Sequence, residues 1–316
     1  MTNYQLSAIC YLLLASLLSA CATGESRGSS SPTEAPAAPP TESVQATETP
    51  VKAVLLAVGD IATCNGEGDE VVAQLVENLP GAVALLGDNV YEKGSASQYQ
   101  HCYDPNWGPF KNRTHPAVGN HEYLTLKASG YFNYFGPAAG DPTQGYYSYA
   151  LGAWHLIALN SNCSQVGGCQ AGSAQEQWLR ADLAAHPAAC TLAYWHHPLF
   201  SSGQHGSNTQ MWAVWQALYE AGADVVLNGH DHDYERFAPQ DPEGVADSAQ
   251  GLREFVVGTG GKNHYKFSQA PSANSEVRND KTFGVLKLTL SPQSYTWEFI
   301  PEPGKSFADQ GEAVCH

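Results

Sequence analysis

Two short apolar runs with an amphipathic segment between them open the part of the chain that follows residue 50. We expect strands over 51–58 and 82–86, because each is a short and nearly continuous apolar run. Between them, 69–79 repeats its apolar residues at helical spacing, with Val72 and Val76 on one face. A strand, a helix and a strand in this order form a βαβ unit, whose two strands pair in parallel. The chain is therefore expected to have an α/β fold.

Strands and helices continue to alternate beyond residue 150, with strands expected at 155–159, 192–195 and 225–227. One helix is expected after Ser173, which forms a capping-box pattern with Glu176, and it should end before Pro187. A second helix is expected over 209–221, with Gly222 placed to end it. After residue 254 only strands are expected, and we expect them to close the sheet in antiparallel pairing, at 255–258, 283–290 and 295–300.

Residues of types that can bind metals follow several of these strands. Asp88 and Tyr91, in Gly87-Asp88-Asn89-Val90-Tyr91, come directly after the strand at 82–86, at the edge where an open α/β sheet holds its functional residues. A carboxylate at this place can bridge two metal ions. Tyr91 can bind a metal only as a phenolate, and because a free phenol has a pKa near ~10, it requires a strongly Lewis-acidic ion such as ferric iron.

Four more segments present metal-ligand side chains at strand ends or on loops. They are Gly59-Asp60, Gly119-Asn120-His121-Glu122, Trp195-His196-His197-Pro198 and Gly229-His230-Asp231-His232. Each segment alone has an ordinary structural explanation. Gly59-Asp60 and Gly119-Asn120-His121 can be turns, a histidine before Pro198 can simply be extended, and His230 can cap the preceding strand. The spacing of two residues puts His230 and His232 on the same side of an extended segment, as two adjacent metal ions require. Taken together and in this order, the segments predict a metal site.

The complete set resembles the motifs of the calcineurin-like metallophosphoesterases and, within them, of the purple acid phosphatases, including the small tartrate-resistant type. Most of that superfamily begins with Asp-x-His, whereas this chain has Asp60-Ile61-Ala62. The purple branch also lacks this histidine and has a tyrosine at the position of Tyr91. Gly258-Thr259-Gly260-Gly261 resembles a loop of the larger purple phosphatases. The resemblance implies a four-layer αββα sandwich of two mixed sheets flanked by helices.

The resemblance also implies a centre with two metal ions. The first would be bound by Asp60, Asp88, Tyr91 and His232, and the second by Asp88, Asn120, His196 and His230, with Asp88 shared. Hard oxygen ligands and a phenolate suit Fe(III) at the first site, and the mixed nitrogen and oxygen set suits Fe(II), Zn or Mn at the second. His197 is the alternative to His196, although the His-x-Pro pattern of the family favours His196.

Three residues are expected to act on the substrate by the same resemblance. His121 and His205 occupy positions where the small purple phosphatases have histidines that contact substrate or protonate the leaving alkoxide, and Asn120 would also bind substrate. Glu122 and Asp231 would orient ligand histidines. The expected reaction is the hydrolysis of phosphomonoesters by attack of a metal-bound hydroxide at the dinuclear centre.

Three alternative functions can be compared with this one. A phosphodiesterase or nucleotidase of the same superfamily would use the same ligands, so the ligands do not distinguish it. A metallo-β-lactamase requires His-x-His-x-Asp-His, and this chain has Tyr234 in place of that aspartate. A surface lipoprotein that binds metal or phosphate without turnover would be expected to lack a bridging ligand or a leaving-group acid, yet Asp88 and His121 are both present.

The first 50 residues indicate export from the cytoplasm. Residues 1–20 contain an apolar run of the length of a signal-peptide core, and Leu18-Ser19-Ala20-Cys21 resembles the bacterial lipobox, in which the cysteine is lipidated after cleavage. Residues 21–50 are rich in Ser, Thr, Pro and Ala, which predicts a disordered tether, and 51–316 would form the catalytic domain. We therefore expect a lipoprotein of the bacterial cell envelope, or otherwise a secreted protein.

The acidic composition limits the partners of the chain. Its formal net charge of −16 at pH 7 repels nucleic acid and anionic lipid at long range. A small phosphate ester is the expected substrate, because bound metal cations can supply the positive charge that the few Lys and Arg residues do not. Membrane contact is expected only through a lipidated Cys21. The sequence does not indicate which oligomeric state the protein has.

Of the 8 cysteines, Cys10 and Cys21 belong to the export signal, which leaves 8 − 2 = 6. An even number in an exported chain suggests disulfides. Several pairing patterns are possible, and we favour Cys64 with Cys102, Cys163 with Cys169, and Cys190 with Cys315. The alternative, a zinc site made of thiolates, would require Cys-x-x-Cys pairs, which the sequence lacks.

Overall fold

The computed structural model describes residues 52–267 and 270–316. The predicted export signal at 1–20 and the predicted tether at 21–50, which begins with Cys21, lie outside these residues. Among the helices that the model describes, none is long and apolar enough to cross a membrane. All the candidate metal ligands named above lie inside the described ranges.

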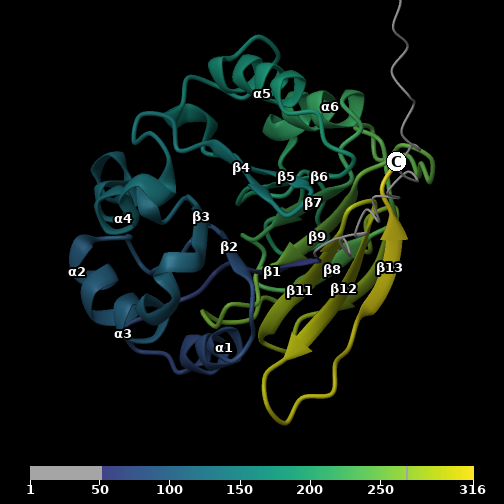
Figure 1. Cartoon of the computed structure of the whole chain (residues 1–316). Coiled ribbons are helices and arrows are strands. Elements are labelled where there is room, and N and C mark those ends of the chain that lie inside the picture. Colours follow the sequence, from purple (N-terminus) through teal and green to yellow (C-terminus); the bar gives the residue numbers. More distant parts are fainter. Residues whose placement is uncertain (1–51, 268–269) are drawn as a thin grey trace, which may run out of the picture. The chain divides into compact units, whose positions relative to one another are not determined.

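The first of two mixed sheets contains the predicted βαβ unit (Figure 1). In order across this sheet, the described strands are β13 (Gln310–Val314), β12 (Ser294–Pro301), β11 (Gly284–Ser291), β1 (Ala53–Val58), β2 (Ala82–Leu86) and β3 (Thr114–Ala117). β1, β2 and β3 are parallel, as predicted. β11, β12 and β13 extend the sheet in antiparallel pairing, which confirms the expectation for 283–290 and 295–300.

The second sheet holds the remaining described strands. In order they are β10 (Ser275–Asn279), β8 (Tyr234–Phe237), β9 (Arg253–Val257), β7 (Val225–Asn228), β6 (Thr191–Tyr194), β5 (Trp154–Ala158) and β4 (Tyr147–Leu151). β5, β6, β7 and β9 are parallel to one another. The expectation of antiparallel pairing for 255–258 is therefore correct on one side only, because β9 is antiparallel to β8 but parallel to β7.

The described helices cover the outer faces of the two sheets. They are α1 (Gly68–Glu77), α2 (Ala96–Gln98), α3 (Asp104–Trp107), α4 (Ser129–Phe135), α5 (Ala174–Ala185) and α6 (Trp212–Glu220). Residues of α1 and α4 pack against Leu56 and Val58 of β1, on one side of the first sheet. Residues of α5 and α6 pack against Ile157 and Val226, on one side of the second sheet. The fold is thus the predicted four-layer αββα sandwich.

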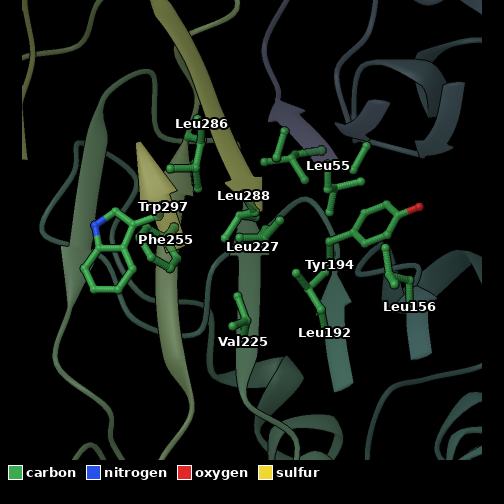
Figure 2. Packing of buried hydrophobic residues seen from close by; sticks show 14 of the residues in the cluster. Leu55, Leu156, Leu192, Tyr194, Val225, Leu227, Phe255, Leu286, Leu288 and Trp297 are labelled. Atoms are coloured by element: carbon green, nitrogen blue, oxygen red, sulfur yellow. The ribbon is translucent and has the colours of Figure 1, made fainter. Parts of the chain in front are cut away.

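The central core lies between the two sheets. Figure 2 shows Leu55, Leu286 and Leu288 from the first sheet facing Leu227 and Tyr194 from the second. Because side chains alternate along a strand, the neighbours of Leu55 point to the other face and are covered by helices. Strands buried on both faces must be apolar at every position, which is why β1 and β2 are continuous apolar runs in the sequence.

The predicted helix ends are largely confirmed, with two local differences. Ser173 caps α5 by accepting a hydrogen bond from the Glu176 backbone N–H (3.3 Å), but the Glu176 carboxylate accepts from Gly172 and not from Ser173 (2.9 Å). α6 begins at Trp212, one turn later than predicted, because residues 209–211 form a 3-10 turn. Gly222 follows α6 with a φ of +72°, a value that glycine adopts without strain.

The three disulfides have the pairing that the sequence favoured. Cys64 is bonded to Cys102, Cys163 to Cys169, and Cys190 to Cys315. The last of these joins the start of β6 to the C-terminal end of the chain, across 125 residues of sequence. Disulfides persist in oxidising compartments and are rare in the cytosol, so they agree with an exported domain.

A buried carboxyl group in α1 is predicted to make stability depend on pH. Asp69 is 1% exposed, and none of the described residues donates a hydrogen bond to its Oδ1. Burial raises the pKa of Asp69 from 3.8 to about 7, so between these values the folded state keeps a proton that the unfolded state has released. The free energy of unfolding should therefore fall as pH rises through this window, by up to about 4 kcal/mol from this group.

Replacing Asp69 with Asn should remove that contribution, because an amide does not titrate. Urea unfolding of both proteins at several pH values measures the difference. The two proteins should have similar stability near pH 4, and the variant should become the more stable one toward pH 7. A stability difference that stays constant over this range would contradict the prediction.

Candidate metal centre

Loops that follow the carboxyl ends of parallel strands from both sheets meet at one edge of the sandwich. Asp60 follows β1, Asp88 follows β2, and Asn120 follows β3, all in the first sheet. His196 follows β6 and His230 follows β7 in the second sheet. Backbone hydrogen bonds join these loops, since the Asp60 N–H donates to Gly87 (3.1 Å) and the Gly229 N–H donates to His196 (3.0 Å). Ligand candidates that are far apart in sequence are thereby fixed close together.

The first donor set consists of four predicted ligands, Asp60, Asp88, Tyr91 and His232. Its side chains converge on the Tyr91 hydroxyl. This hydroxyl lies 2.8 Å from Asp60 Oδ1, 3.1 Å from Asp88 Oδ2 and 3.1 Å from His232 Nε2. His232 Nε2 is also 3.3 Å from Asp60 Oδ1. All four side chains are at least 97% buried.

The second donor set consists of Asp88, Asn120, His196 and His230, and it is centred on His196. Its Nε2 lies 3.1 Å from Asn120 Oδ1, 3.2 Å from Asp88 Oδ2 and 3.3 Å from His230 Nδ1. Asp88 Oδ2 therefore lies within 3.2 Å of an atom in each set. Atoms bound to one metal at roughly 2.0 to 2.2 Å must lie about 3 Å apart, so the separations in both sets fit a bound cation.

The ionisation of the buried groups also fits cation binding. Burial, together with the carboxylates of Asp60 and Asp88, raises the pKa of Tyr91 well above its ordinary value. Burial opposes charge on Asp88 and His196 as well, but their mutual attraction is stronger. It holds the pKa of Asp88 below its ordinary value and raises the pKa of His196 to about 9. A proton is thus held between the donor atoms, where a cation could replace it.

The backbone at three candidate ligands adopts the left-handed conformation. Asp60, Asp88 and His230 have φ values of 61°, 48° and 72°, which are uncommon for residues other than glycine. Such strain persists only where surrounding contacts impose it, and it concentrates at functional sites. Gly119 has a different role, because a Cβ atom there would lie 2.1 Å from Asp88 Oδ1. The glycine leaves the space that the Asp88 carboxylate fills.

The groups that orient the candidate ligand histidines are not the ones that we predicted. His196 Nδ1 donates to the Leu86 carbonyl (2.9 Å), and His232 Nδ1 lies 3.1 Å from Asn263 Oδ1. Glu122 instead accepts hydrogen bonds from backbone N–H groups, including those of Asp88 (3.1 Å) and Gly119 (2.8 Å). Its carboxylate thus holds the loops that follow β2 and β3.

Asp231 likewise holds a loop and not a histidine ring. Its carboxylate accepts from the Ser201 hydroxyl (2.5 Å) and from the backbone N–H of His205 (2.7 Å). The prediction for Glu122 and Asp231 was wrong for one reason. Sequence proximity to a histidine does not determine where a short acidic side chain points, and backbone donors from other loops are nearer.

The two histidines predicted to act on substrate contact different members of the donor sets. His121 Nδ1 donates to the Glu92 carbonyl (2.7 Å), and His121 Nε2 lies 3.9 Å from Asp88 Oδ2. The His205 ring is stacked on the His230 ring, with 4.4 Å between the centroids, and His205 is exposed. His197, the alternative to His196, is bonded through Nδ1 to the Ser161 hydroxyl (2.8 Å).

The loop after β9 brings residues to the site that the sequence did not single out. The Tyr265 ring stacks on His232 at 4.0 Å, and Lys262 Nζ lies 4.5 Å from the centre of the Tyr91 ring. Asn263, between them, orients His232. The glycine motif at 258–261 was the available signal, because its glycines allow this loop to approach Asp60 and Asp231 closely.

The chain is similar in sequence to known phosphoesterases. The family model for calcineurin-like phosphoesterases matches residues 53–234. Purple acid phosphatase 15 of Arabidopsis thaliana is 29% identical over 217 residues, which cover 57% of this chain and 40% of that protein. The matched region therefore spans less than half the length of this curated relative.

Solved structures share the fold at lower sequence identity. The purple acid phosphatase PPD1 from yellow lupin (Lupinus luteus) seeds has a TM-score of 0.72 and 18% identity, over 84% of this chain and 54% of that one. GAP50, described as the anchor in the inner membrane complex of Plasmodium, has a TM-score of 0.64 and 13% identity, over 84% of this chain and 89% of that one. At these identities the likeness establishes the fold alone.

Proposed function

Because the chain belongs to the calcineurin-like phosphoesterase family, we propose that it is an exported, metal-dependent phosphatase that hydrolyses phosphomonoesters. One observation carries the proposal: Asp88 Oδ2 lies 3.1 Å from the Tyr91 hydroxyl and 3.2 Å from His196 Nε2. A single carboxylate thus faces two donor sets. The site is also buried in a domain of negative net charge, where a phosphate ester could bind only beside cations.

The proposed ligands of the first metal ion are Asp60, Asp88, Tyr91 and His232, and those of the second are Asp88, Asn120, His196 and His230. We assign Fe(III) to the first set because a phenolate and carboxylates are hard oxygen ligands, and Fe(II), Zn or Mn to the second set. Two such cations, when bound, would supply positive charge for the phosphate oxygens and lower the pKa of a coordinated water.

The residues of the chain that would act on the substrate are Asn120, His121 and His205. A carbonyl oxygen only accepts hydrogen bonds, so the contact with Glu92 keeps a proton on His121 Nδ1. His121 Nε2 is then the nitrogen that is free to take up a second proton, and in this doubly protonated form it can donate that proton to a leaving alkoxide. Its 26% exposure leaves room for a substrate to approach. His205, which stacks on His230, would contact the phosphate from the loop that Asp231 holds.

The substrate class is tested by comparing a phosphomonoester with a bis-ester of the same alcohol. The proposal expects a higher kcat/KM for the monoester. A clear preference for the bis-ester would identify a phosphodiesterase of the same family, and a preference for nucleoside monophosphates over other monoesters would identify a nucleotidase. Absence of turnover with all of these substrates in the metal-loaded protein would contradict the enzymatic proposal.

Tyr91 is expected to give the protein a visible colour, because a ferric phenolate absorbs visible light. Tyr91→Phe should abolish the absorption band and lower the iron content of the first set, since a phenyl ring has no ligand atom. Tyr131→Phe is the matched control, because Tyr131 is also buried but donates to the Pro116 carbonyl (2.8 Å), outside the donor sets. A colourless, iron-free but active wild-type protein would keep the phosphatase proposal and remove the ferric assignment.

Export is proposed from the lipobox pattern at 18–21 and is supported by the three disulfides. In this proposal the mature chain starts at a lipidated Cys21 of the bacterial cell envelope, and the tether at 22–50 separates the lipid from the catalytic domain. Mass spectrometry of the N-terminal peptide tests it. An unmodified N-terminus beyond residue 21 in the culture medium would indicate secretion without an anchor.

A further inference from the structure

A second group of metal-ligand side chains lies at the other end of the strands of the second sheet. His155 is the second residue of β5, at its amino end, whereas the candidate metal centre lies beyond the carboxyl ends of the strands. Asp182 and His186 are four residues apart at the end of α5, so they occupy the same face of the helix. Nothing in the proposed phosphatase function uses these three residues.

The donor atoms of the three side chains converge. His155 Nε2 lies 2.7 Å from Asp182 Oδ2, and His186 Nδ1 lies 3.1 Å from Asp182 Oδ1. The carboxylate is oriented further by the Ser148 hydroxyl, which donates to Oδ1 (2.7 Å). One donor atom from each of the three possible ligands lies within 4.8 Å of the other two. Two ligand atoms on a tetrahedral zinc ion are about 3.3 Å apart, so only small adjustments would be needed.

Burial and the adjoining space agree with a bound cation. The side chains of His155 and Asp182 are 6% and 7% exposed, whereas His186 is 57% exposed and yet turns its Nδ1 inward. This Nδ1 also lies 3.0 Å from the Asp182 backbone carbonyl, so a bound cation would have to replace the proton that this contact holds. His155 and His186 also line a cavity of about 590 Å³, together with Tyr149 and Trp154. A fourth ligand, from water or a small molecule, can therefore reach the donor atoms from the cavity.

We propose that His155, Asp182 and His186 form a third metal site, which binds a divalent transition ion such as Zn²⁺ with one coordination position open to the cavity. Two imidazoles and one carboxylate are typical zinc ligands, and a set of three protein ligands leaves the fourth position free. The ion would link the end of α5 to β5 and stabilise the folded state, because the unfolded chain holds no such arrangement of ligands. The site is independent of the proposed phosphatase function.

Zinc content after metal removal and equilibrium dialysis against Zn²⁺ tests the site in the full chain. His186→Ala is the informative variant, because the side chain is largely exposed and its removal should leave the fold intact. Wild type should bind one more zinc ion per chain than His186→Ala. His101→Ala is the matched control, because His101 is also an exposed helical histidine with its Nδ1 bonded to the carbonyl four residues earlier, that of Ser97 (2.8 Å). This control should keep the wild-type zinc content.

A second measurement separates this site from the candidate dinuclear centre. In an Asp88→Asn background, Zn²⁺ should still raise the melting temperature, and the additional change His186→Ala should remove that increase. If the dinuclear centre does not bind metal at all, wild type should bind a single zinc ion, and His186→Ala should bind none. Failure of the phosphatase proposal can therefore be distinguished from failure of the third site. Equal zinc content in wild type and His186→Ala, or an equal loss in His101→Ala, would overturn the third site.

Discussion

Replacing Asp88 with Asn is expected to lower phosphatase activity by about 10²- to 10³-fold, the range found when preorganised electrostatic stabilisation is removed. The Asp88 carboxylate is 2% exposed, and its Oδ2 faces both Tyr91 and His196. An amide carries no charge and offers one acceptor oxygen, so it cannot serve two cations. We therefore also expect the variant to lose metal from both donor sets. Steady-state kinetics with a phosphomonoester and metal analysis of the purified variant measure the two effects.

Asp69→Asn is the matched control for this substitution. Asp69 is likewise a buried aspartate, at 1% exposure, but it lies at the start of α1 and outside both donor sets. It should retain the wild-type metal content and kcat/KM. If Asp88→Asn retained two metal ions and activity within a few fold of wild type, the bridging role of Asp88 would be wrong, and with it the proposed centre.

Replacing His121 with Asn is expected to lower kcat by about 10²- to 10⁴-fold for an alkyl phosphate, the usual contribution of a general acid. The loss should be much smaller for a phosphate ester of an acidic phenol, because such a leaving group departs without protonation. The metal content should stay unchanged, since the contact of His121 with Asp88 Oδ1 is made by the backbone N–H (2.8 Å) and survives the substitution. Kinetics with the two ester types measure the difference.

His101→Asn serves as the control for His121→Asn, because His101 is a histidine on the surface that has no contact with the donor sets. It should leave both ester types unaffected. An equal loss for alkyl and aryl esters in His121→Asn would contradict the role of His121 as an acid. That outcome would indicate that His121 binds the phosphate group instead.

The fold itself does not separate an enzyme from a binding protein. The solved structures with this fold include a purple acid phosphatase and a protein described as a membrane-complex anchor. What argues for catalysis in this chain is the set of side chains, namely a carboxylate at Asp88 that faces both donor sets and a candidate acid at His121 whose Nε2 is left free by the contact of Nδ1 with Glu92. The substitutions above test these two features directly.

The α/β class, the parallel βαβ unit and the approximate bounds of α1, α5 and α6 could be predicted because they depend on local patterns, whereas the shorter helices α2, α3 and α4 were not predicted. Periodicity of apolar residues is a property of neighbours in sequence, and it identified β1, α1 and β2 within a few residues. Strands that are short or polar were missed. β3 contains Pro116, and β13 reads Gln-Gly-Glu-Ala-Val, so neither presents an apolar run.

The types of candidate ligand and their order along the chain could also be read from the sequence, because each candidate lies within a few residues of a glycine turn or a strand end. Long-range packing decided the rest. It set the separation of Tyr91, Asp88 and His196, and it made Leu86 and Asn263 the partners that orient the histidines. It also brought β5 and α5 together at His155 and Asp182. Local sequence specifies which atoms a chain offers to a metal, but only the packing of distant segments specifies which of them meet.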